Sequence, residues 1–151
     1  MSLENLLKIG QLKRHESDEK EIGKLLTSAR RNLADARVNA VSPETRFDAA
    51  YKALMQAGIV ALLAHGYRPD TARPGHHQTV IQSLRLTTGI SASRINVLDT
   101  LRRKRNLSDY MGEDIDQSSV DVCVEQAMHL LGDVEDWLLT NRPQWMVSPR
   151  K

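Results

Sequence analysis

Apolar residues recur along most of the chain at the spacing of an α-helix. After Ser17 or Asp18, either of which can cap a helix, one apolar face is formed by Ile22, Leu25, Leu26, Ala29, Leu33 and Ala36. No sustained alternation of apolar and polar residues suggests a half-buried strand, and Ala, Leu, Arg, Glu and Gln fill the long segments. The pattern therefore predicts an all-α protein.

Caps and helix-breaking residues divide this pattern into an up-and-down bundle of about five to six helices. Ser42 and Pro43 begin one long helix, Gly66 ends it, and two prolines and two glycines predict a loop over 66–75. The predicted helices cover 3–12, 17 or 18 to 36, 43–65, 76–89, 91 or 93 to about 110, and 118–140. We expect one domain over 1–151, with its core at about 18–140, an N-terminal helix or extension over 1–17, and a tail over 141–151.

Size and composition favour a soluble protein. The chain has 151 residues, 40% of them hydrophobic and 26% charged, which is close to the globular average. Its longest apolar run, "ALMQAGIVALLAHG", is interrupted by Gln56 and Gly58 and is shorter than the roughly 20 residues that span a bilayer. We therefore expect a buried helix, no membrane contact and a cytoplasmic location. The single cysteine, Cys123, lies among apolar residues, which predicts an inert core thiol.

The charged residues are unevenly distributed, although the net charge is only +2. Basic residues cluster between Arg94 and Arg105, in and just before the stretch "LDTLRRKRNLSDYMGEDI", whereas Asp and Glu dominate 113–136. At about 100° per residue, Arg105 and Asp109 fall on the continuation of the apolar stripe that contains Leu98. The pattern allows two interpretations: an ion pair between Arg105 and Asp109 at the end of a helix, or a functional cluster with Asp109 in support.

The stretch "LRRKRNLSDYMG" resembles a motif of the HEPN family of helical-bundle proteins. The preceding "RFDAAYKALMQAGIVALLAHGYRP" and "GHHQTVIQSL", and the long closing helix, extend this resemblance over about 18–140. It implies a bundle similar to the C-terminal helical domain of nucleotidyltransferases. Many family members are metal-independent ribonucleases with an arginine, often followed by a polar residue, and a histidine four to six residues later. The matching residues here are Arg105 and Asn106.

The position of the family's histidine holds Tyr110 in this chain. A phenol, with a reference pKa of about 10, is a poor general base near neutral pH. Arg105 and Asn106 still suit an anion, so the pattern favours binding over cleavage. Arg94, Arg102, Arg103 and Lys104 would provide a surrounding positive field that contacts phosphates.

The histidines do not replace the missing base in this interpretation. Neighbouring residues such as His76 and His77 cannot both face one side of a helix, so we expect them to begin a helix or to make structural hydrogen bonds. We expect structural roles for His65 and His129 as well, and packing roles for Tyr51 and Tyr67. No metal site and no cofactor are predicted.

Three functions remain open at this point. The first is a HEPN-like module that binds a nucleotide, RNA or a partner protein, such as a nucleotidyltransferase, with little or no catalysis. The second is a metal-independent endoribonuclease of a toxin–antitoxin or defence system, in which a homodimer joins two Arg105 motifs over one cleft. The third is a structural homodimeric bundle whose basic stretch is merely solvated.

Overall fold

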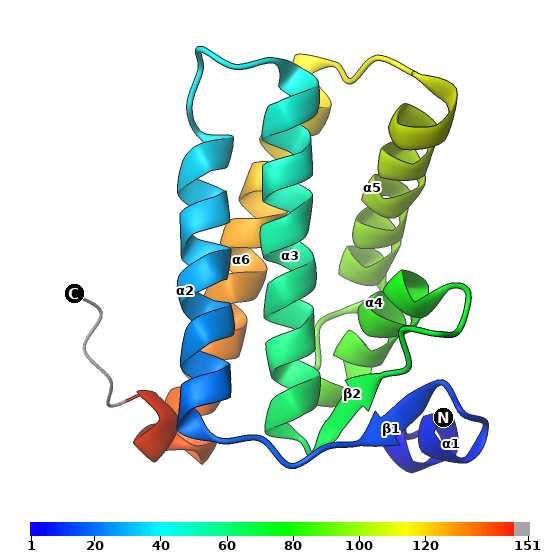
Figure 1. Cartoon of the computed structure of the whole chain (residues 1–151), viewed down its shortest axis with the longest axis vertical. Helices are drawn as coiled ribbons and strands as arrows, with labels where there is room; N and C mark the ends of the chain where they lie inside the picture. Colours follow the sequence, from blue (N-terminus) through cyan, green and yellow to red (C-terminus); the bar gives the residue numbers. More distant parts are fainter. Residues whose placement is uncertain (147–151) are drawn as a thin grey trace.

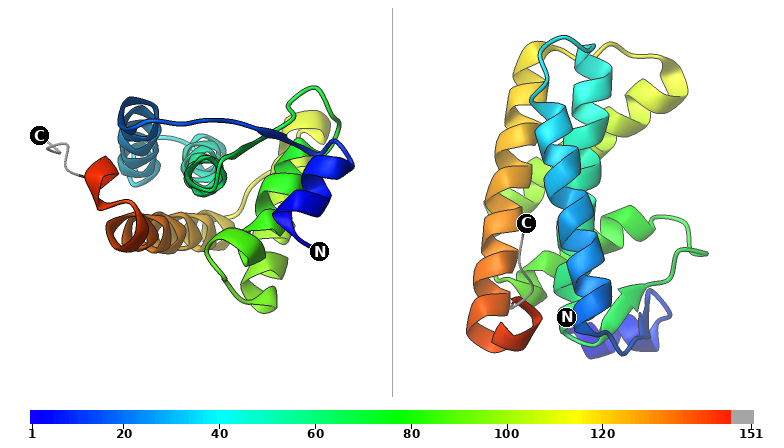
Figure 2. Two further views of the ribbon diagram at one scale, coloured as in Figure 1. Left: turned by 90° about the horizontal axis from the view of Figure 1, so that it is seen from below. Right: turned by 60° about the vertical axis from the view of Figure 1, so that its left-hand side comes forward.

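Four long helices determine the architecture of this computed structural model, which describes residues 1–146 (Figure 1). They are α2 (Glu19–Ala36), α3 (Pro43–Ala64), α5 (Ala92–Met111) and α6 (Gln117–Asn141). Helix α3 lies at the centre, with α2 and α6 on one side and α5 on the other (Figures 1 and 2). The shorter elements are α1 (Leu3–Lys8), β1 (Leu12–Arg14), β2 (Tyr67–Pro69), α4 (His76–Thr87) and the 3-10 helix η1 (Pro143–Met146). The predicted all-α bundle is confirmed.

Helix α3 forms the middle of the hydrophobic core. Its buried residues cover most of the helix circumference and leave one narrow face, with Asp48 and Lys52, exposed, so neighbouring elements must cover the remaining faces. Phe47, Leu54 and Leu62 are among its fully buried side chains. By length and composition alone, α3 is the one described helix that is apolar enough to cross a membrane, and 72% of its most apolar window is buried inside the bundle.

Three of the long helices begin at residues that the sequence identified as caps. The side-chain oxygens of Asp18 and Ser42 accept hydrogen bonds from the backbone N–H groups three residues later, at 2.9 and 3.2 Å. Ser91, rather than Ser93, caps α5 in the same way. Each cap satisfies a backbone donor that the first turn of a helix leaves without a partner.

The buried thiol of Cys123, with its pKa raised by burial to about 12, agrees with the predicted core position.

Two features of the N-terminal region differ from the sequence-based expectation. The first helix ends at Lys8 instead of continuing to residue 12, because Gly10 adopts a left-handed conformation with φ of 80°. The chain then forms β1, which pairs antiparallel with β2 inside the predicted 66–75 loop, placing Leu12 opposite Pro69. This short sheet departs from the helix predicted over 3–12 and from the loop predicted over 66–75, within a fold that is otherwise helical. Each strand has only three residues, too few for an alternating pattern to be recognised.

A glycine allows α4 to approach α3 closely. A Cβ atom added at Gly58 would lie 2.7 Å from Cγ1 of Val80, a buried residue of α4. Real Cβ atoms essentially never come so close to another atom, so any larger residue at position 58 must displace the Val80 side chain or the helix that carries it. Gly132 of α6 is also helical, but a Cβ there would meet nothing within 4 Å.

These two glycines provide a matched test of the helix packing. We expect Gly58→Ala to lower the free energy of unfolding by about 1–3 kcal/mol, because it overpacks the contact with Val80. Gly132→Ala should raise it by about 0.5–1 kcal/mol, because alanine favours the helix and meets no neighbour. Urea unfolding followed by circular dichroism measures both, and equal effects of the two changes would contradict the close contact.

Candidate functional site

The side chain of Arg105 lies where α5 passes α3. Its Nε donates to Oδ2 of Asp109 at 2.9 Å, and its guanidinium carbon lies 5.5 Å from the centre of the Tyr51 ring. The ion pair between Arg105 and Asp109 was one of the two interpretations of the sequence, and the structure contains it. The side chains of Arg105 and Asp109 are 30% and 34% exposed, so water reaches both charges. A cation held against an aromatic face and beside a carboxylate is fixed in place but still accessible.

Tyr51 connects this arginine to the core and to α4. Its side chain belongs to the buried face of α3 and is 3% exposed. Its hydroxyl lies 3.2 Å from Nδ1 of His77, and either group can donate, depending on the tautomer of the imidazole. Burial raises the pKa of Tyr51 to about 12, although the charges of Arg105 and Arg102 oppose this rise. Tyr51 is therefore a neutral hydrogen-bonding group at physiological pH.

His77 is kept neutral by its surroundings. Burial, together with the smaller effects of the nearby charges of His76, Arg105 and Arg102, lowers the pKa of His77 to about 4. Desolvation disfavours the imidazolium, and neighbouring cations disfavour a second positive charge. His76, by contrast, lies at the start of α4, where its Nδ1 can donate to the carbonyl oxygen of Arg73 over a long distance of 3.4 Å.

A further carboxylate, that of Asp48, adds to the charges around Arg105. Asp48 lies one turn before Tyr51 on α3. Partial loss of water around its carboxylate raises the pKa of Asp48, the charge of Asp109 raises it further, and Arg105 opposes both. We call Asp48, Tyr51, His77, Arg105 and Asp109 the Arg105 cluster. It combines one cation, two carboxylates, a phenol and a neutral imidazole on three helices.

Two of the residues predicted beside Arg105 lie outside its contacts. The side chain of Tyr110 is 79% exposed, and Asn106 is half-buried. Within residues 1–146, neither side chain forms a hydrogen bond with a member of the cluster. The structure thus brings Arg105 together with Asp109 and leaves Tyr110 directed toward solvent.

The basic residues predicted to form a positive field are each paired with a carboxylate. Arg102 and Arg103 share Asp99, at 2.8 Å each, and the hydrogen bond from Arg102 lowers the pKa of that buried carboxyl. Lys104 lies 4.0 Å from Asp116, and Arg94 lies 2.7 Å from Asp133. Arg94 is also about 16 Å from Arg105 along the helix axis, at about 1.5 Å per residue. Each cation of this group therefore has a carboxylate partner, and Arg102 and Arg103 share one.

Sequence reasoning missed three members of the cluster: Asp48, Tyr51 and His77. Tyr51 was assigned to packing, which its burial confirms, and His77 was assigned to a helix start or a structural hydrogen bond. The available signal was the spacing of Asp48 and Tyr51, which places them on one face of a helix. Nothing in the local pattern could show that α4 brings His77 to that same face.

No family model matches the chain, and no curated protein matches it. The resemblance to the HEPN family rests on the quoted residues and on their order along the chain. Among residues 1–146, no group of three His, Cys, Asp or Glu side chains could hold a metal ion.

The low pKa of His77 predicts a specific dependence of stability on pH. The unfolded chain binds a proton at this histidine near pH 6.5, whereas the folded chain does so only near pH 4. We expect this group to reduce stability progressively as the pH falls from about 6.5 to 4, and to have no effect above about pH 7.5. Histidine NMR titration should give a midpoint near pH 4 for His77.

The substitution His77→Gln should remove this part of the acid-induced loss of stability, measured by urea unfolding at several pH values. His129→Gln serves as the control, because His129 is exposed on α6. A His77 midpoint above pH 6 would show that the imidazole is not desolvated as the structure indicates.

Proposed function

We propose that this protein is a HEPN-like module that binds the phosphate group of a nucleotide at Arg105, without catalysing a reaction. The observation that carries the proposal is how the Arg105 side chain is held. Its guanidinium is held over the Tyr51 ring, while its carboxylate partner, Asp109, is about one-third exposed. Exposed ion pairs contribute little to stability, about 0–1 kcal/mol, so a phosphate can replace Asp109.

Arginine is well suited to this exchange because its planar fork of donors binds phosphate oxygens in pairs. Tyr51 and neutral His77 add uncharged hydrogen-bonding groups beside the guanidinium. Arg102 lies about one turn away and adds positive potential, because it shares the single carboxylate of Asp99 with Arg103. This balance supports a small ligand with one or a few phosphates over a long polyanion, since a polyanion requires several uncompensated cations.

Removing the competing carboxylate should strengthen phosphate binding. We expect Asp109→Asn to tighten the binding of ATP or AMP about two- to fivefold, because Arg105 loses the ion pair with which phosphate competes. Arg105→Gln should weaken binding about tenfold or more, since it removes the charged donor. Isothermal titration calorimetry in the presence of a chelator measures both effects.

Asp133→Asn is the matched control, because it removes a carboxylate from the ion pair of Arg94 and leaves the Arg105 cluster intact. Its nucleotide affinity should stay within about twofold of the wild type. If neither nucleotide binds, or if Asp109→Asn weakens binding while Arg105→Gln has no effect, the ion pair is purely structural and the proposal fails.

A second candidate function, metal-independent endoribonuclease activity, is favoured by the position of His77. If Nδ1 of His77 donates to the hydroxyl of Tyr51, Nε2 keeps a free electron pair. Nε2 could then take the proton of an RNA 2′-hydroxyl as its oxygen attacks phosphorus, while the 5′-oxygen leaves and takes a proton from water. A base with a pKa of about 4 is weak, so any cleavage by this route would be slow.

Incubating labelled RNA with the protein in chelator tests this candidate. Slow cleavage that both His77→Gln and Arg105→Gln reduce at least about tenfold would support it. His129→Gln, which removes an exposed histidine of α6, should cleave at the wild-type rate. Cleavage that survives both cluster substitutions would indicate a contaminating nuclease, and the absence of cleavage would leave binding as the function of the site.

A further inference from the structure

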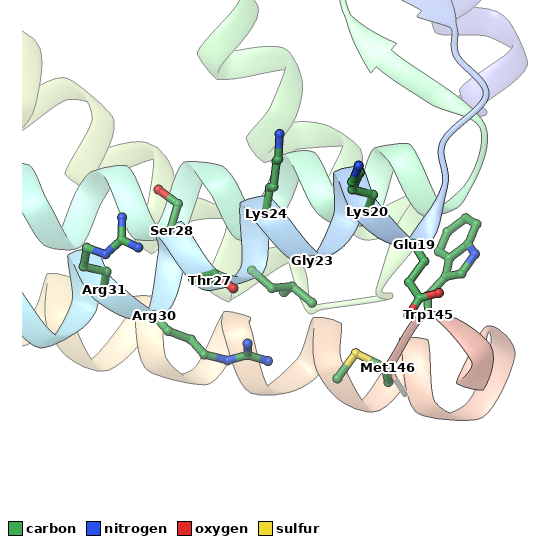
Figure 3. A pocket seen from close by; sticks show the side chains of 11 residues that line it. Glu19, Lys20, Gly23, Lys24, Thr27, Ser28, Arg30, Arg31, Trp145 and Met146 are labelled. Carbon is green, nitrogen blue, oxygen red and sulfur yellow. The ribbon is translucent and has the colours of Figure 1, made fainter. Parts of the chain in front are cut away.

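A groove runs along α2 where the 3-10 helix η1 packs against it (Figure 3). It encloses about 610 Å³, a volume typical of ligand-binding clefts. Its basic lining residues are Lys20, Lys24, Arg30 and Arg31, and its single acidic one is Glu19. Arg30 is engaged in an ion pair with Glu135 of α6. The groove therefore has an excess of positive charge.

Three of these cations differ from those of α5 in their ion pairing. Lys20, Lys24 and Arg31 are exposed, and none of them forms an ion pair within residues 1–146. The basic residues of α5 between Arg94 and Arg105, in contrast, are all paired. The unpaired cations therefore lie on α2, a helix that the sequence analysis did not identify as a basic surface.

The spacing of the three cations suits an extended anion. Lys20 and Lys24 are about 6 Å apart along the helix axis, and Arg31 follows about 10.5 Å further on. Figure 3 shows Lys20 and Lys24 projecting to the same side of α2 and Arg31 further along, rather than all three converging on one point. A chain of phosphates can contact all of them, whereas one small anion cannot.

Gly23 keeps the middle of the groove open. It lies inside α2, where glycine weakens a helix relative to alanine. A Cβ at this position would meet nothing within 4 Å, so the packing of the fold does not require a glycine. The missing side chain leaves room for a ligand backbone to approach the helix.

An aromatic ring lies at the end of the groove away from Arg31. The indole of Trp145, in η1, lies beside Glu19 and is half-buried, and the guanidinium carbon of Arg142 is 5.3 Å from its ring. Aromatic rings beside a basic groove are the common means by which proteins bind single-stranded nucleic acids, because every base can stack.

We propose that this α2 groove binds single-stranded nucleic acid, with Lys20, Lys24 and Arg31 on successive phosphates and a base against Trp145. The surface is separate from the Arg105 cluster, because α2 and α5 lie on opposite sides of α3 (Figures 1 and 2). The inference therefore does not depend on the function proposed for Arg105.

Fluorescence anisotropy with a labelled oligouridylate of about a dozen nucleotides tests the proposal. The double variant Lys20→Gln, Lys24→Gln should weaken binding about tenfold at low salt and reduce the slope of log affinity against log salt by about 1.4. Gly23→Gln, which fills the groove without changing the charge, should also weaken it. Lys8→Gln, Lys52→Gln is the matched control, because it removes two exposed lysines from other surfaces and should leave the affinity within about twofold.

Two further measurements identify the ligand class. Trp145→Leu should weaken oligouridylate binding about fivefold or more and leave the binding of inorganic polyphosphate, which has no bases, unchanged. The proposal fails if oligouridylate does not bind, or if the two double lysine variants lose affinity equally. It also fails if Trp145→Leu weakens the binding of oligouridylate and of polyphosphate to the same extent, or if polyglutamate fully displaces the oligouridylate. Loss of binding in Arg105→Gln would place the oligonucleotide at the other site and overturn it as well.

Discussion

The burial of α3 around most of its circumference is the constraint on which the rest of the structure depends. A helix with so many apolar residues is stable in water only when neighbours cover most of its surface. Helices α2 and α6 cover one side, and α4 covers another through the close contact at Gly58. The same arrangement positions the Arg105 cluster, because α3 presents Tyr51 where α4 supplies His77 and α5 supplies Arg105.

The two basic regions of the molecule, on α5 and on α2, differ in whether their cations form ion pairs. On α5, Asp99 lies three and four residues before Arg102 and Arg103, and Asp109 lies four residues after Arg105, so one helix supplies both partners of these pairs. On α2, Asp35 lies four residues after Arg31, but Lys20, Lys24 and Arg31 form no ion pair in the described part of the chain. A count of basic residues along the sequence therefore suggests an anion-binding surface on α5. In the folded structure, the cations without an ion-pair partner lie on α2.

The sequence predicted features whose causes are local. The caps at Asp18, Ser42 and Ser91 and the Arg105–Asp109 pair each involve residues within four positions of one another, so helical spacing was sufficient to predict or to suggest them. The pairing of β1 with β2 joins segments more than 50 residues apart, and the contact of Tyr51 with His77 joins two helices. Such contacts depend on how the elements pack, which the local pattern does not contain.

The properties of the cluster explain why binding suits it better than catalysis. Cleavage through a 2′-hydroxyl requires one group to accept a proton and another to donate one near neutral pH. His77 offers at most a weak base, and only in the tautomer whose Nδ1 donates to Tyr51. If Tyr51 donates instead, Nε2 carries the proton and cannot accept another. Phosphate binding at Arg105 is compatible with either tautomer, because the guanidinium keeps its charge at any physiological pH.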